Sequence, residues 1–300
     1  MRLAPPVSPR LKAQRRAGLL LAAPACVLLF VVLLLPSSAV VLLSFTDYTL
    51  GAGMPAFVGL ASYKAILSDP VFRSSARNTA VFVSIVAPAS IGLGLVFALM
   101  IGARTTLKRF YRMAFFLPVT ATFVAMATAW EVLLHPTFGL FNTILSFAGL
   151  EKIRFLSDPG IALYAIAAIG VWKQVGYNMI LFLAGIATIP PELYEAASLD
   201  GAGQGWRRFL LVTWPMLRPV TLFVVVITLI RALSEFETVA VLTGGGPVHA
   251  TGVVLFQLYE EAFRFLKIGT GSALAVLFLA FVAALSLIQT TLSDRRAPHV

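Results

Sequence analysis

Charged and hydrogen-bonding side chains occur inside one of the most apolar parts of this sequence. Four of them follow the i, i+3, i+4, i+7 spacing of a single helix face, namely Arg231, Ser234, Glu235 and Thr238. An ionised side chain at the centre of a bilayer costs about 2.5–3.5 kcal/mol. We therefore expect this face to line a bundle interior or a watery path, with Arg231 and Glu235 able to pair on it.

A second polar set lies earlier in the chain, also within an apolar run. Gln174, Tyr177 and Asn178 share one side of a helix. The two sets predict a polar translocation path lined by two neighbouring helices. Two alternatives remain open. The charges could form an internal ion pair that only holds helices together, or they could lie nearer the outward-facing surface of the membrane.

Motifs for catalysis and metal binding are missing from the sequence. It has no G-x-x-x-x-G-K-[ST] phosphate loop, no G-x-S-x-G and no H-E-x-x-H. Its one cysteine, Cys26, lies in an apolar run, and His135, His249 and His299 are far apart without ligand spacing. We expect no catalytic residue, no metal site and no cofactor on this chain, so energy must come from a partner or an ion gradient.

The composition is that of a polytopic membrane protein. Of 300 residues, 59% are hydrophobic and only 12% are charged, with a mean hydropathy of +0.91. The net charge of +10 comes from short basic runs between apolar spans, which argues against nucleic acid as a partner. We predict an all-α fold with six transmembrane spans, at about 18–43, 79–101, 113–134, 160–189, 216–242 and 269–292.

Both ends of the chain are predicted to be cytoplasmic. With the basic tail 1–17 and the tail 293–300 inside, the inner segments hold fourteen basic residues and the outer connectors hold seven. This excess is the positive-inside pattern. A basic start before an apolar run is also typical of a secretory signal peptide, but the run is long and no A-x-A site closes it, so we expect a span.

The same topology places the polar segment Glu195–Pro215 in the cytoplasm. It follows Pro190-Pro191, begins with an Ala-rich run that favours a helix, is interrupted by Gly201, Gly203 and Gly205, and then becomes basic. A helix–glycine–helix unit between two spans is a candidate for docking a partner, and an ordinary loop is the alternative.

This segment resembles the cytoplasmic motif of permease subunits from binding-protein-dependent ABC importers, EAA-x3-G, nine residues, then I-x-L-P. Glu195, Ala196, Ala197 and Gly201 match its first half, and Val212–Pro215 match its second. Ten residues rather than nine separate Gly201 from Val212, and Trp214 stands where Leu is usual. The departures leave the geometry of the second short helix open.

Further motifs resemble the carbohydrate branch of that family, which includes the maltose-transporter type, and they occur in family order. They are Phe57-Val58-Gly59-Leu60 with Tyr63, Asn78-Thr79, Gly139 with Asn142, Trp172, Ile189-Pro190, Asp200-Gly201-Ala202, Leu242–Pro247 and Ile268-Gly269 with Ser272-Ala273. Each is weak alone, and the ordered set is strong.

The resemblance implies a type I importer permease in a bacterial plasma (inner) membrane. The segment that contains Glu195, Ala196, Ala197, Asp200 and Gly201 would be a coupling helix that docks on a cytoplasmic ATPase subunit, which binds the ATP and Mg. A second related permease, two ATPase subunits and an extracytoplasmic solute-binding protein would be the partners, within the lipid bilayer. Closure of the ATPases would alternate access to the path.

The resemblance also implies that the central site draws on the two spans that flank the coupling segment. The expected substrate-path residues are therefore Gln174, Tyr177, Asn178, Arg231, Ser234 and Glu235. Hydrogen-bonding groups with an aromatic ring suit a sugar, whereas Arg231 suits a glycerol-phosphate type of solute unless Glu235 neutralises it.

Two other classes of function remain as alternatives. An ion-coupled secondary transporter would use Glu235 and Arg231 as a relay, but we find no convincing internal repeat between the two halves. A membrane-embedded enzyme would need a catalytic constellation, and none is present.

Overall fold

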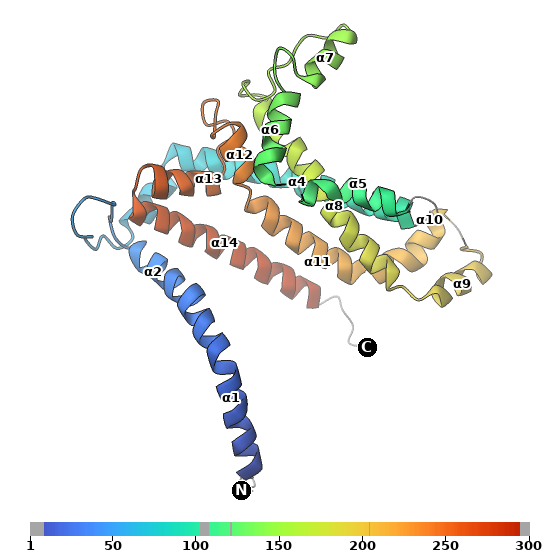
Figure 1. The fold of residues 1–300 in the computed structure, drawn as a ribbon, viewed down its shortest axis with the longest axis horizontal. Helices are drawn as coiled ribbons and strands as arrows, with labels where there is room; N and C mark the ends of the chain where they lie inside the picture. Colours follow the sequence, from blue (N-terminus) through green and yellow to red (C-terminus); the bar gives the residue numbers. More distant parts are fainter. Residues whose placement is uncertain (1–8, 103–107, 121, 204, 295–300) are drawn as a thin grey trace. The chain divides into compact units, whose positions relative to one another are not determined.

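The computed structural model describes residues 9–294 except 103–107, 121 and 204. The tails predicted at 1–17 and 293–300, and the basic loop that follows the second predicted span, therefore lie partly outside the described residues. Every regular secondary-structure element that is described is a helix (Figure 1). A single bridge, between Thr46 and Phe57, is the one strand-like pairing in this part of the chain.

Long helices are separated along the chain by one or more shorter helices. In chain order they are α1 (Pro9–Leu29), the π-helical turn η1 (Phe30–Leu34), α2 (Leu35–Leu43), α3 (Ala61–Ser68), α4 (Pro70–Gly102), α5 (Lys108–Thr120), α6 (Phe123–Leu133), α7 (Leu140–Phe147), α8 (Ala162–Ala187), α9 (Pro191–Leu199), α10 (Gly205–Arg208), the π-helical turn η2 (Phe209–Thr213), α11 (Trp214–Leu233), α12 (Glu237–Leu242), α13 (Val254–Tyr259), η3 (Glu260–Arg264) and α14 (Ile268–Asp294).

Five stretches of the described chain are long and apolar enough to cross a membrane. They are Leu20–Leu43, Pro70–Gly102, Ala162–Ala187, Gly205–Leu242 and Ile268–Gln289. The segment 113–134, predicted as the third span, is divided between α5 with 13 residues and α6 with 11. Each of these is shorter than the ~20 residues that a membrane-spanning helix needs.

The helix that contains the predicted span 79–101 begins earlier, at Pro70. The carboxylate of Asp69 accepts a hydrogen bond from the backbone N–H of Val71 at 2.9 Å, as an N-cap does. Proline is favoured at the first helical position because its missing N–H would be unpaired there in any case. The local sequence therefore extends this helix by about two turns beyond its most apolar part.

The chain divides into two compact units. The first comprises the described residues up to Ala65 together with Glu261–Leu277, and the second comprises Ile66–Glu260 with the described residues from Phe278 onward. In the first unit, the hydroxyl of Tyr63 donates to Ser44 Oγ at 2.7 Å. The apolar window within Leu20–Leu43 contains no buried residue.

In the second unit, α8 packs against α4, α5 and α11. Small residues permit this close approach, as they do in membrane bundles generally. A Cβ at Gly170 would lie 2.9 Å from the ring of Phe82 in α4. A Cβ at Gly176 would overlap the backbone carbonyl of Phe115 in α5. The glycines of α8 thus set the spacing of the helices around it.

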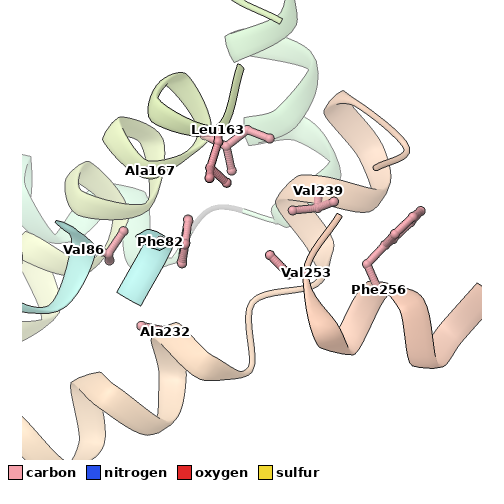
Figure 2. Packing of buried hydrophobic residues seen from close by; sticks show 9 residues of the cluster. Phe82, Val86, Leu163, Ala167, Ala232, Val239, Val253 and Phe256 are labelled. Atoms are coloured by element: carbon pink, nitrogen blue, oxygen red, sulfur yellow. The ribbon is translucent and has the colours of Figure 1, made fainter. Parts of the chain in front are cut away.

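One apolar core joins α4, the beginning of α8 and the end of α11 to α12 and α13 (Figure 2). Its buried members are Phe82, Val86, Leu163, Ile166, Ala167, Ala232, Val239, Val253 and Phe256. In Figure 2 the ring of Phe82 lies between the helices that carry Leu163 and Ala232. A second buried cluster joins α4, α8 and α11 farther along the helices, with Phe182 and Met179 fully enclosed.

Buried polar side chains fix the loop between α12 and α13 onto α4. The amide nitrogen of Asn78 donates to the carbonyls of His249 at 3.0 Å and Gly252 at 2.9 Å. The hydroxyl of Thr79 accepts from the backbone N–H of Val254 at 3.0 Å. Because these groups are bonded, their burial does not leave donors or acceptors unpaired.

Candidate functional site

The predicted polar stripe of the fifth span is not one continuous helix face. The helix α11 ends at Leu233, and α12 begins only at Glu237. The buried carboxylate of Glu235 accepts hydrogen bonds from Thr238, at 3.1 Å from its backbone N–H and 2.6 Å from its hydroxyl. A carboxylate near a helix N-terminus satisfies unpaired N–H groups, so Glu235, which precedes the N-cap residue Phe236, stabilises the first turn of α12.

The pairing of Arg231 with Glu235, which their spacing allows, does not occur in the structure. No ion pair joins them among the described residues, because the helix break separates them and Thr238 occupies the carboxylate. The guanidinium of Arg231 instead lies over the ring of Tyr177, 3.9 Å from its centroid. The structure thus brings together one predicted residue from α8 and one from α11 in a cation–π contact.

Asn178 binds three helices together. Its amide nitrogen donates to Ser90 Oγ in α4 at 3.2 Å, and its amide oxygen accepts from Thr228 Oγ1 in α11 at 2.9 Å. All three side chains are fully buried. The prediction missed Ser90 and Thr228, although a hydroxyl within an apolar span was a signal for them. Asn178 therefore ties α8 to α4 and α11, and its expected place on the path stays a prediction.

Gln174 lies one turn before Asn178 and has unused hydrogen-bonding capacity. It is buried, and its amide oxygen finds no partner among the described residues. An unpaired buried acceptor costs about 1–3 kcal/mol.

The neighbouring residue, Lys173, forms an ion pair at 3.6 Å with Glu237 at the start of α12. Ser234, the C-cap of α11, is exposed.

The helix α9 carries the EAA motif and ends in a Schellman cap. Gly201 follows the helix with a φ of 76°, a left-handed conformation that glycine adopts without strain. The N–H of Ala202 donates to the carbonyl of Ala197 at 2.7 Å, and that of Gly201 to Ser198 at 3.3 Å. Ala197 and Ala202 are both buried at this turn, whereas Glu195, Ala196 and Asp200 are exposed.

The segment after the glycines is held against α9 through Tyr194. Its hydroxyl lies 3.3 Å from Thr213 Oγ1, which belongs to η2, and the guanidinium of Arg208 lies 4.9 Å from its ring centroid. Arg208 also donates to the carbonyl of Gly203 at 3.5 Å. These contacts join α9 directly to the segment that leads into α11.

The extra residue before Val212 coincides with a π-helical turn. Phe209–Thr213 forms η2, in the middle of an otherwise α-helical run from Gly205 to Leu233. A π-helical turn closes its hydrogen bonds over one more residue than an α-helical turn. One additional residue can therefore be absorbed locally, so that Trp214 and Pro215 still begin α11.

Comparisons with known proteins agree with one another. A sequence profile of the family described as "Binding-protein-dependent transport system inner membrane component" matches residues 90–298. The sulfoquinovosyl glycerol transport system permease protein SmoG of Agrobacterium fabrum is 34% identical over 269 residues, covering 89% of this chain and 86% of that protein. The sn-glycerol-3-phosphate transport system permease protein UgpA of the same organism is 32% identical over 281 residues, covering 93% and 95%.

A solved structure shares the fold. One chain of a bacterial alginate ABC transporter, in complex with an alginate pentasaccharide-bound periplasmic protein, matches this chain with a TM-score of 0.84. The match covers 95% of this chain and 96% of the other, at 23% identity. At that identity the similarity shows a common fold and leaves the solute to be argued from the residues.

Proposed function

The chain belongs to the family of inner membrane components of binding-protein-dependent transport systems, and from this membership we propose how it couples to its partners and moves its solute. It is a permease subunit of an ABC importer of the sugar and glycerol-phosphate type, located in the inner membrane. It is a translocation subunit and not an enzyme. Its fold is that of a type I ABC permease.

The proposal includes six crossings with both ends of the chain in the cytoplasm. Five are the apolar stretches of the described chain, and α5 with α6 supply the remaining one, as two shorter helices in sequence. The excess of basic residues on the inner side supports this orientation. Lipid and a second permease would cover the span Leu20–Leu43, whose apolar window has no buried residue in this chain.

We assign α9 as the coupling helix, which docks on one of two cytoplasmic ATPase subunits that bind ATP and Mg. The supporting observation is its shape: a short helix with exposed Glu195 and Asp200, closed by a Schellman cap at Gly201 and joined to α11 through Tyr194. A rigid, exposed helix that is connected to a span suits the transfer of movement. An extracytoplasmic binding protein would deliver the solute on the other side.

A first test replaces Glu195 by alanine. We expect its carboxylate to accept a charge-assisted hydrogen bond from the ATPase, which contributes about 1.5–3 kcal/mol. Glu195→Ala should therefore weaken copurification of the ATPase about tenfold or more. The matched control is Glu192→Ala, which removes an exposed carboxylate from the first turn of the same helix, outside the motif. Equal ATPase recovery from both variants would contradict the assignment of α9.

For the solute, we propose a polyhydroxylated molecule with an anionic group. Gln174 offers an unpaired amide oxygen, and Glu235 and Ser234 lie at the break between α11 and α12. Arg231 is not neutralised by Glu235, so its charge remains available for a phosphate or carboxylate. The named solutes of the relatives, such as sn-glycerol 3-phosphate and the acidic polysaccharide alginate, are consistent with this class.

The Arg231–Tyr177 contact provides a second test. We expect Arg231→Gln to lower solute-stimulated ATP hydrolysis by the assembled transporter about tenfold, because a charge-assisted contact to the solute is lost. Tyr177→Phe keeps a ring under the guanidinium and should retain most of the stimulation. The solute used in this assay is the one that remains bound to the copurifying binding protein. Full stimulation of Arg231→Gln would remove Arg231 from the path and leave the coupling role of α9 untouched.

A further inference from the structure

A hollow of about 500 Å³ lies in the second unit, outside the predicted path. Three segments that are distant in the sequence form its walls: the end of α6, the loop before α8, and the loop after α12. Its polar or loop-forming lining residues include Glu131, His135, Arg154, Ser157, Thr243 and Pro247. This volume is within the range of sites for small molecules.

Buried hydrogen bonds hold two of these walls together. The amide nitrogen of Asn142 donates to the carbonyls of His135 at 3.2 Å and Ile153 at 2.9 Å, and its oxygen accepts from the N–H of Ile153 at 2.8 Å. Asn142 is completely buried. It therefore positions both the end of α6 and the residue that precedes Arg154.

A second buried side chain shapes the third wall. The hydroxyl of Thr251 donates to the carbonyl of Gly246 at 2.6 Å and lies 2.7 Å from Thr243 Oγ1. Thr251 is fully buried, and Asn78 anchors the same loop to α4. These internal hydrogen bonds preorganise the walls, and preorganisation lowers the cost of binding.

The charged side chains of the hollow are not used by this framework. Among the described residues, no hydrogen bond or ion pair engages the side chain of Glu131 or Arg154, and both residues are exposed. Hydroxyls from Ser157 and Thr243 and the ring of Phe155 complete a lining of mixed polarity. Donors, acceptors and an apolar face in one hollow suit a saccharide, whose ring has polar edges and apolar faces.

The hollow and α9 belong to opposite ends of α8. Arg154 and Ser157 precede this helix and α9 follows it, and its 26 residues span about 39 Å. On the proposed function, which this inference rests on, α9 is cytoplasmic, so the hollow opens on the extracytoplasmic side. We propose that it is an entry subsite, where a saccharide is held after release from the binding protein and before it reaches the path beside Arg231.

The test measures binding of two probes, glucose and glucuronate, to the full chain in lipid nanodiscs by saturation-transfer NMR. We expect both to bind in the unmodified chain. Arg154→Gln should lower the glucuronate-to-glucose signal ratio about two- to fivefold, and Glu131→Gln should raise it by a similar factor, as expected for partly solvated charges. Glu151→Gln is the control, because this exposed carboxylate in the same loop does not line the hollow.

Two outcomes would overturn the proposal. The first is no signal from either probe in the unmodified chain. The second is a probe ratio that responds to Arg231→Gln but stays constant in the Arg154 and Glu131 variants. Failure of the proposed function is separately visible, because ATPase recovery with Glu195→Ala does not depend on whether sugars bind the hollow.

Discussion

We expect Gly94→Leu to lower the stability of the folded chain strongly, whereas Gly92→Leu, two residues earlier on the same helix, is tolerated. A Cβ at position 94 would lie 2.8 Å from the Cβ of Asn178 and 3.1 Å from the backbone nitrogen of Met179. Real Cβ atoms essentially never come within 3.0 Å of another atom, as this one would to Asn178, and a leucine side chain there has no space. At Gly92, nothing lies within 4 Å of the added Cβ.

The loss of stability depends on how far the clash separates α4 from α8. Separating α4 from α8 also breaks the hydrogen bond from Asn178 to Ser90. The free-energy cost of overpacking and the cost of losing a buried hydrogen bond therefore add. Overpacking alone costs up to about 3 kcal/mol, which corresponds to a lowering of the melting midpoint by roughly 10 °C.

The measurement is the fraction of chain that remains monodisperse in size-exclusion chromatography after heating in detergent. The chain is purified without partners, so that contacts made by position 92 in an assembly do not enter the comparison. Gly94→Ala serves as an intermediate step, since it adds the Cβ alone. If both leucine variants melted at the same temperature, the close α4–α8 contact would not be needed for stability.

The second large effect is expected at Gly201, where Gly201→Val should uncouple the transporter without unfolding it. The left-handed backbone at this residue, with a φ of 76°, costs a residue with a side chain about 1–2 kcal/mol, and more for a β-branched one. No atom lies within 4 Å of an added Cβ, so the penalty comes from the backbone and not from a clash. The turn after α9 would open, and ATP-driven uptake by the assembled transporter should fall about tenfold.

Two controls distinguish the effect of the turn after α9 on uptake from the effect of backbone strain elsewhere. Gly201→Asn places a residue that tolerates the left-handed region and should retain most of the uptake. Gly149→Val introduces the same kind of strain at a φ of 72°, also with no atom within 4 Å, but in the loop between α7 and α8. Uptake that fell equally with Gly149→Val and Gly201→Val would show that strain in general, and not the turn after α9, causes the loss.

Much of the fold and the family could be predicted from local features of the sequence. Hydropathy located the apolar stretches because the cost of burying a charge in lipid acts on each segment by itself. The EAA motif located α9, since its alanines and Gly201 determine a helix and its cap within eight residues. These properties depend on neighbours in the chain, so the sequence alone was enough.

The polar site was decided by tertiary structure. Spacing placed Arg231 and Glu235 on one helix face, but the helix breaks between them and Glu235 accepts a hydrogen bond from Thr238 in the first turn of α12. Asn178, expected on the path, meets Ser90 and Thr228 instead. Such partners come from helices 50 and 88 residues away. Which polar groups meet depends on helix ends, rotations and glycine contacts, and hydropathy and periodicity do not encode these.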